Sequence, residues 1–108
     1  MIVLAAALML AGPDSSADLR HDFVECLKGA VGKAKEQKIA ADGFVAFAHT
    51  TCAGSEEPFR SALASANLSH GMSRKDSTAD ANSQVSDYYS EWHDNYAGET
   101  QQAAATPK

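Results

Sequence analysis

The chain has 108 residues, which is enough for one domain, and a formal net charge of −5. The four lysines between residues 28 and 38 are interrupted by Glu25 and Glu36, so they do not form a basic block. A mildly acidic protein of this kind has no broad electrostatic attraction to nucleic acid or to anionic membranes. Charge and composition therefore exclude a nucleic-acid partner bound through a basic face.

Residues 1–17 are predicted to be a cleaved signal peptide. The apolar run MIVLAAALMLAG has the length of a signal-peptide core and is shorter than the about 20 apolar residues that a transmembrane helix needs. Small residues at Ser15, Ser16 and Ala17 favour cleavage before Asp18, which would leave no transmembrane span in the mature chain. No Lys or Arg precedes the run, and the alternative is a buried N-terminal helix of a cytosolic protein.

Two helices are predicted next, over residues 18–38 and from Phe44 to about residue 53. Apolar residues recur in both at spacings of three and four. Residues 39–43 (IAADG) look like the connection, with Asp42 as a cap. A break or kink is expected at Gly54-Ser55, because Glu56 and Glu57 suit the first turn of a new helix and Pro58 is tolerated only there.

The rest of the chain is predicted to be helical up to Gly98. An apolar stripe continues from residue 59, and Gly71 indicates a kink or short loop before a helix capped by Ser73 or Ser77. Gly98 is the expected stop. The tail, residues 99–108, has no apolar period and is predicted to be disordered, so the folded domain would span residues 18–98.

The two cysteines, Cys26 and Cys52, lie 14 residues before and 12 residues after a turn centred near Ala40. At the helical rise per residue their depths in an antiparallel hairpin differ by only about 3 Å. Both belong to the apolar stripe of their helix, which is what a cross-helix disulfide needs. Such a bridge would stabilise a small alanine-rich core by about 3.5 kcal/mol and would persist in an oxidising compartment. The alternative is a pair of buried thiols.

A metal-binding module is the second hypothesis. His49 and Cys52 share a helical face, and a reduced Cys26 with a nearby His21 would complete a set that zinc accepts. The spacing matches no motif with two tight ligand pairs. His70 and His93 lie in polar stretches and are expected to be solvated. We find no phosphate-binding loop, nucleophile elbow or haem motif in the sequence, so neither enzymatic activity nor a cofactor is expected.

The segment DYYSEWHDNY is the richest local feature of the sequence. Its large aromatic residues could pack the last helix onto the hairpin, or could form a surface for an unknown protein partner, because Tyr and Trp are common at interfaces. One tyrosine, Tyr89, is expected to stay exposed, because a small core cannot bury every ring. The candidate partner surface comprises Tyr88, Tyr89, Trp92 and Tyr96.

Scattered residues also resemble small exported helical proteins of sphingomonad-type bacteria over residues 23–96. The resemblance implies a periplasmic, helical, disulfide-bonded protein and carries over no catalytic residue. The residues that carry it are Cys26-Leu27, Phe44, Cys52, Glu56, Phe59-Arg60, Gly71-Met72-Ser73-Arg74, Asp80-Ala81 and Asp87-Tyr88-Tyr89.

Together these patterns predict an all-α protein: an antiparallel helical hairpin with a cross-helix disulfide, followed by a long or kinked C-terminal helix. The expected location is periplasmic or secreted. The expected role is a non-enzymatic interaction or envelope function.

Overall fold

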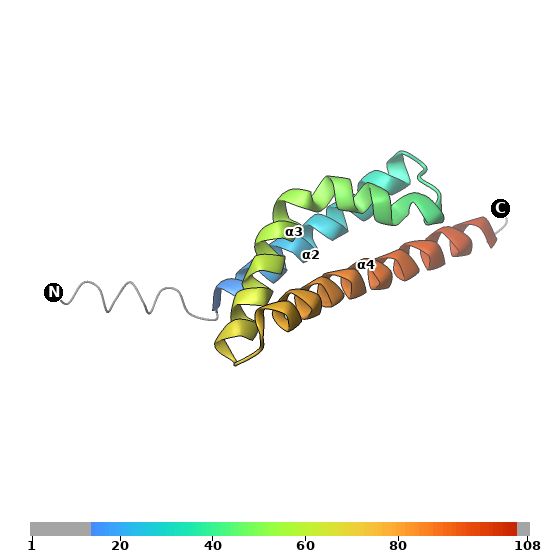
Figure 1. The fold of residues 1–108 in the computed structure, drawn as a ribbon. Helices are drawn as coiled ribbons and strands as arrows, with labels where there is room; N and C mark the ends of the chain where they lie inside the picture. The colour runs from blue at the N-terminus through green and yellow to red at the C-terminus, as the bar shows by residue number, and fades with distance from the viewer. Residues whose placement is uncertain (1–13, 106–108) are drawn as a thin grey trace.

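The computed structural model describes residues 14–105, which form three α-helices and one short 3-10 turn (Figure 1). The helices are α2 (Asp14–Glu36), α3 (Phe44–Ser69) and α4 (Arg74–Ala105), and the 3-10 turn η1 covers Ala41–Gly43. They pack antiparallel in chain order, and α3 contacts both other helices. This confirms the predicted all-α class and the hairpin. The predicted signal peptide lies mostly outside the described residues, although α2 includes its last four.

Helix α2 ends at a left-handed residue, Lys38, whose φ is 57°. The amide of Ile39 donates to the carbonyl of Ala34 at 2.9 Å, and the amide of Lys38 donates to that of Lys35 at 3.2 Å. These two bonds form a Schellman motif, which satisfies carbonyls that the helix end would otherwise leave open. The chain then reverses through η1 and enters α3, as expected for residues 39–43.

Helix α3 runs without interruption through the positions at which a new helix was predicted to begin. Pro58 lies inside the helix rather than in a first turn. Its ring nitrogen carries no hydrogen, so the carbonyl of Gly54 receives no amide bond from it, and proline rings bend the helices that contain them. Figure 1 shows α3 changing direction along its length. Of the two predicted alternatives, a break or a kink, the structure therefore shows a bend within one helix, and no separate helix starts at Glu56.

The predicted loop at Gly71 is confirmed, and Ser73 caps the helix that follows it. Gly71 has a φ of 96°, a conformation that glycine adopts without steric cost. The hydroxyl of Ser73 accepts a hydrogen bond from the amide of Asp76 at 3.1 Å. Ser77, the alternative cap, is instead 1 % exposed and faces the interior.

Helix α4 does not end at Gly98 but continues to Ala105, so the expected stop was wrong. Gly98 does not have the positive φ of a helix stop, and a Cβ atom there would meet nothing within 4 Å. Residues 99–105, predicted to be disordered, are helical. Residues 106–108 lie outside the described part of the chain.

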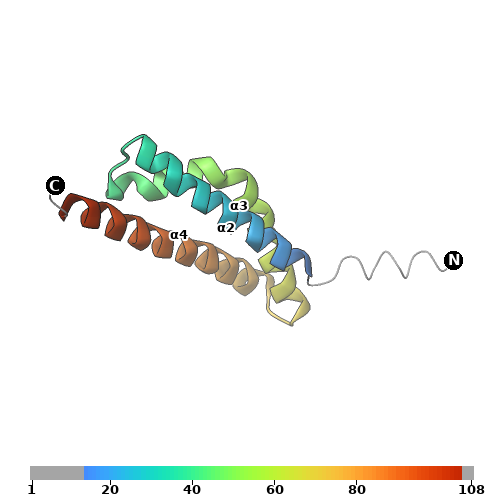
Figure 2. The same cartoon turned by 180° about the vertical axis from the view of Figure 1, so that it is seen from behind.

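The core is a single cluster of side chains to which all three helices contribute. Figure 2 shows the three helices from behind. Phe23 of α2 lies at the centre of the core: its ring is 5.5 Å from that of Phe59 and contacts Tyr88 and Tyr89 edge-on. At the other end Phe44 stacks on Tyr96 with 4.6 Å between ring centroids. Among the described residues, no helix is long and apolar enough to cross a membrane.

Candidate functional site

Cys26 and Cys52 form the predicted disulfide, which joins α2 to α3 with 5.8 Å between the Cα atoms. Cys52 is buried and Cys26 is partly buried, so the link closes the hairpin at its core. The carbonyl oxygen of Thr51 lies 3.8 Å from the sulfur of Cys26. This is a contact only, because a disulfide sulfur has no proton to donate.

The disulfide uses the two cysteines that the metal hypothesis requires as ligands. Both sulfurs are bonded to each other, and a zinc site would need them as separate thiolates. Within the described residues no three His, Cys, Asp or Glu side chains are grouped so that they could hold a metal ion. His49 instead binds Glu56, and His21 is exposed on α2. The alternative set of His49, Cys52, Cys26 and His21 was therefore wrong as a metal site.

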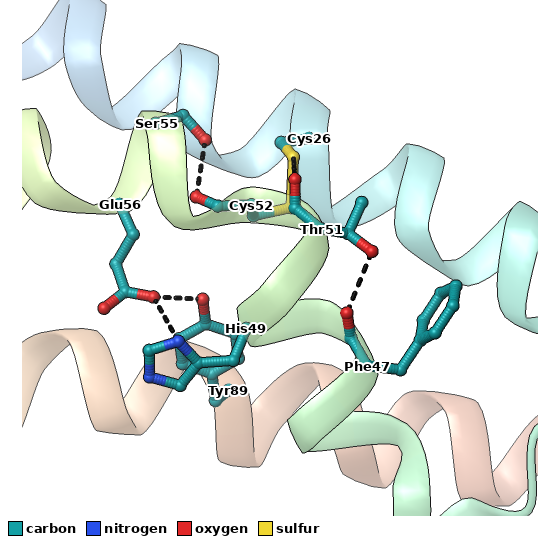
Figure 3. The surroundings of a disulfide bond; sticks show 8 residues. All are labelled: Cys26, Phe47, His49, Thr51, Cys52, Ser55, Glu56 and Tyr89. Carbon is teal, nitrogen blue, oxygen red and sulfur yellow. Dashed lines mark hydrogen bonds and ion pairs between the residues drawn. A yellow bond between two sulfur atoms is a disulfide. The ribbon is translucent and has the colours of Figure 1, made fainter.

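Glu56 is the unexpected feature of the molecule, because this carboxylate is only 2 % exposed. Figure 3 shows the disulfide on the side of α3 towards α2, while Glu56 extends towards Tyr89 of α4. One carboxylate oxygen accepts a hydrogen bond from the Tyr89 hydroxyl and lies 3.1 Å from Nδ1 of His49. The other oxygen accepts a bond from Arg60, which also binds Glu57.

The position of Glu56 follows from the continuity of α3. It lies four residues after Cys52 and eight after Ala48, so it shares their buried face. A buried carboxylate is costly unless charge and hydrogen bonds compensate it, and Arg60, one turn later, supplies the opposite charge. A spacing of four from Phe44 through Ala48 and Cys52 was the sequence signal for this burial. The interpretation of Glu56 as a helix-start charge obscured it.

Tyr89 is 5 % exposed, so the expectation that it would remain exposed was wrong. Burial, followed by the hydrogen bond to Glu56, raises the pKa of the Tyr89 hydroxyl well above its ordinary value. The His49 ring stacks on Tyr89 with 5.0 Å between centroids. The His49 side chain is still 55 % exposed, as expected for a histidine on a helix surface. This cluster thus fastens α3 to α4.

The four residues of the predicted partner surface do not share one environment. Tyr96 is 1 % exposed, and its hydroxyl donates to the carbonyl of Ile39 at 2.6 Å, so both Tyr96 and Tyr89 belong to the core. Tyr88 and Trp92 are half-buried at its edge. The predicted surface is therefore reduced to Tyr88 and Trp92.

Two hollows on α4 lie beside these two aromatic side chains. The first is lined by Tyr88 with Gln84, Asp87 and Glu91. The second is lined by Trp92 with Asp94, Asn95, Gly98 and Glu99. Asp87 and Glu91 are exposed, and α4 contains no Lys or Arg after Lys75. This side of α4 therefore presents aromatic area together with negative charge.

The remaining histidines, His70 and His93, lie apart from the disulfide and from the Glu56 cluster. His70 is exposed at the end of α3, where its Nδ1 is 2.7 Å from the carbonyl of Ala66. His93 on α4 pairs with its neighbour Asp94 at 3.1 Å. Both are surface residues within a turn of their partners, and neither contributes to the Glu56 cluster.

Comparison with known proteins found no match for this chain. No family model matches the sequence, and neither a curated protein nor a solved structure matches it. The resemblance to small exported helical proteins stays a prediction. Several residues that carry it have clear structural roles: the disulfide at Cys26 and Cys52, the buried Glu56 and the turn at Gly71.

Proposed function

We propose that this chain is a non-enzymatic protein of the periplasm or the extracellular space that binds another protein through the side of α4 carrying Tyr88 and Trp92. The observation that carries the proposal is the division of the α4 aromatic residues. Tyr89 and Tyr96 fill the core, while Tyr88 and Trp92 stay half-exposed beside hollows edged by carboxylates. Half-exposed Tyr and Trp offer contact area with a polar end, which suits an interface.

The disulfide supports the extracytoplasmic part of the proposal, because thiol-reducing systems in the cytosol reduce such bonds. The Glu56 cluster supports a structural rather than a catalytic role for the chain's buried carboxylate. Its two oxygens are bound by His49 and Arg60 within α3 and by Tyr89 of α4, and the Tyr89 bond holds the two helices together.

The binding surface is tested by affinity capture from the native compartment with the parent protein and three variants. We expect a partner captured by the parent to be lost with Trp92→Ala and with Asp87→Asn/Glu91→Gln. The matched control is Asp18→Asn/Asp22→Asn, which removes the same charge from exposed positions of α2. Capture that is equal with all three variants would contradict the proposed surface.

The compartment is tested by the intact mass of protein purified from cells, alkylated with and without prior reduction. We expect alkylation at Cys26 and Cys52 only after reduction, and a mass that reports removal of residues 1–17. Two freely alkylated thiols in the native protein would contradict an oxidising location.

A further inference from the structure

The turn between α3 and α4 exposes two large apolar side chains. Leu68 is 45 % exposed and Met72 is 41 % exposed, and they are the large hydrophobic residues found exposed in the described part of the chain. We call residues 67–75 the α3–α4 tip. Figures 1 and 2 show this turn at one end of the molecule, opposite the turn that joins α2 to α3.

The tip is held rigidly by backbone and side-chain bonds. The amide of Met72 donates to the carbonyl of Asn67 at 3.1 Å, and the amide of Gly71 donates to that of Leu68 at 3.0 Å, which together form a Schellman motif. The Asn67 amide group crosses to α4, where it donates to Asp80 at 2.9 Å. The apolar side chains are thus presented by an ordered turn, so little ordering cost remains for a binding event.

The exposure of Met72 follows from the identity of Asn67. In a Schellman motif the residue after the left-handed position commonly makes an apolar contact with the helix residue five positions earlier or its neighbour. Here that earlier residue is Asn67, whose amide is used to bind Ser77 and Asp80. Its polar side chain is a poor apolar partner for Met72, whose side chain remains exposed.

The charge around the tip is opposite to that of the protein as a whole. Residues 58–75 contain no Asp or Glu, in a chain of net charge −5. Arg74 and Lys75 are exposed, and neither forms an ion pair within the described residues. Beyond the tip, α4 contains acidic residues and no Lys or Arg. Apolar exposure and positive charge therefore coincide at the tip itself, while exposed Asp76 follows it directly and the start of α2 lies at the same end of the molecule (Figures 1 and 2).

We propose that the α3–α4 tip docks onto a lipid bilayer that contains anionic headgroups. Leu68 and Met72 enter the boundary between headgroups and acyl chains, while Arg74 and Lys75 bind lipid phosphates. Apolar area combined with basic residues at the headgroup level is the chemistry of interfacial membrane binding. After Asp76, α4 runs away from the tip, so most of its acidic residues lie away from the bilayer (Figure 1). This surface is distinct from the Tyr88 and Trp92 side of α4.

The test measures partition of the full protein onto vesicles of phosphatidylglycerol and phosphatidylcholine, compared with vesicles of phosphatidylcholine alone. We expect binding only to the anionic vesicles, and weaker binding as salt is raised. Arg74→Gln/Lys75→Gln should lower the partition coefficient about twentyfold, since each basic residue near the surface contributes about a fivefold factor. Leu68→Gln/Met72→Gln should lower it about tenfold or more.

Lys33→Gln/Lys38→Gln is the matched control, because it removes the same charge from exposed residues at the far end of the molecule. Its partition should equal that of the parent. Helical circular dichroism of each variant verifies that the fold is intact. Binding to anionic vesicles that survives both tip variants, or its absence in the parent, overturns the proposal. Binding of a polyglutamate peptide without vesicle binding would assign Arg74 and Lys75 to an acidic protein instead, and would also overturn it.

Discussion

The two helix interfaces of this protein are built from different materials. Near the turn that joins α2 to α3, the buried residues of α2 are Ala30 and Ala34, and the covalent bond between Cys26 and Cys52 links the helices. Farther from the turn, Phe23 of α2 packs against Phe59 of α3. Between α3 and α4 the interface has no covalent link within the described residues. It contains large tyrosine rings and directional polar bonds, among which Tyr89 binds Glu56.

The difference follows from what each side chain contributes on burial. Alanine buries little apolar area, so the interface of Ala30, Ala34 and Ala48 gains little from the hydrophobic effect and profits from a cross-link. Tyrosine buries several times more area, and its hydroxyl then requires a partner, which Glu56 and the carbonyl of Ile39 provide. Near its turn, the α2–α3 interface therefore depends on a covalent bond. The α3–α4 interface depends on large tyrosine rings whose hydroxyls have hydrogen-bond partners.

The largest effect is expected from removal of the covalent link. Cys26→Ser/Cys52→Ser should lower the free energy of unfolding by about 3.5 kcal/mol, because the bridge no longer restricts the unfolded chain. Urea unfolding followed by circular dichroism measures the change. The parent in the presence of a reductant should behave in the same way as the variant. A loss below about 1 kcal/mol would show that packing alone secures the hairpin.

The next largest effect is expected from the buried carboxylate. Glu56→Gln keeps the size of the side chain but removes the charge that Arg60 faces, and should cost about 2 kcal/mol in the same urea experiment. Glu57→Gln is the matched control. The Glu57 side chain is 69 % exposed, so its loss should cost less than about 0.5 kcal/mol. Equal costs for both variants would contradict a special role for the buried residue.

A smaller effect is expected from the Tyr89 hydroxyl, and it should depend on pH. The folded protein raises the pKa of Tyr89 above the unfolded value of about 10. The stability linked to this group is therefore fully present below about pH 10 and is lost as the pH rises above it. Tyr89→Phe should cost about 1.5 kcal/mol at pH 8 and flatten the decline above about pH 10.

Tyr88→Phe is the control for this experiment. Tyr88 is half-buried, and among the described residues it is Tyr89 that donates a hydrogen bond to Glu56. It should keep the alkaline decline of the parent. A decline of the same slope in Tyr89→Phe would assign the pH dependence to another group.

The smallest effect compares the two turns directly. Both helices end with a left-handed residue, which is Lys38 after α2 and Gly71 after α3. Lys38→Gly should raise the unfolding free energy by about 0.5 kcal/mol, and Gly71→Lys should lower it by about 1 kcal/mol, because only glycine adopts this conformation without steric cost. Thermal unfolding of the two variants measures the difference. Shifts of the same sign would contradict this reading of the turns.

The hairpin and its disulfide could be predicted from the sequence, whereas most polar contacts between the helices could not. The similar depth of Cys26 and Cys52 on either side of Ala40 predicted the disulfide of an antiparallel hairpin, and the structure confirms both. Local chemistry likewise identified the turn at Gly71 and gave Ser73 as one of two candidate caps. Each of these features depends on spacing or on residues close together in the chain.

The errors occurred where distant contacts decide the outcome. Glu56 follows Gly54 and precedes Pro58, a pattern typical of a helix start, but packing against α4 keeps the helix continuous and buries the carboxylate. Tyr88 and Tyr89 both fit the apolar spacing and both contact Phe23, and only Tyr89 also reaches Glu56 in three dimensions. Gly98 lies inside α4, because a glycine alone does not end a helix.

The disulfide also conceals one kind of damage. The connection at residues 37–43 is the part of the hairpin with the least helical structure, and exposed connections are preferred sites of proteolysis. A single cut there would leave Cys26 on one fragment and Cys52 on the other, still joined by their sulfurs. The nicked protein would migrate as one species on a gel until a reductant separates the two pieces.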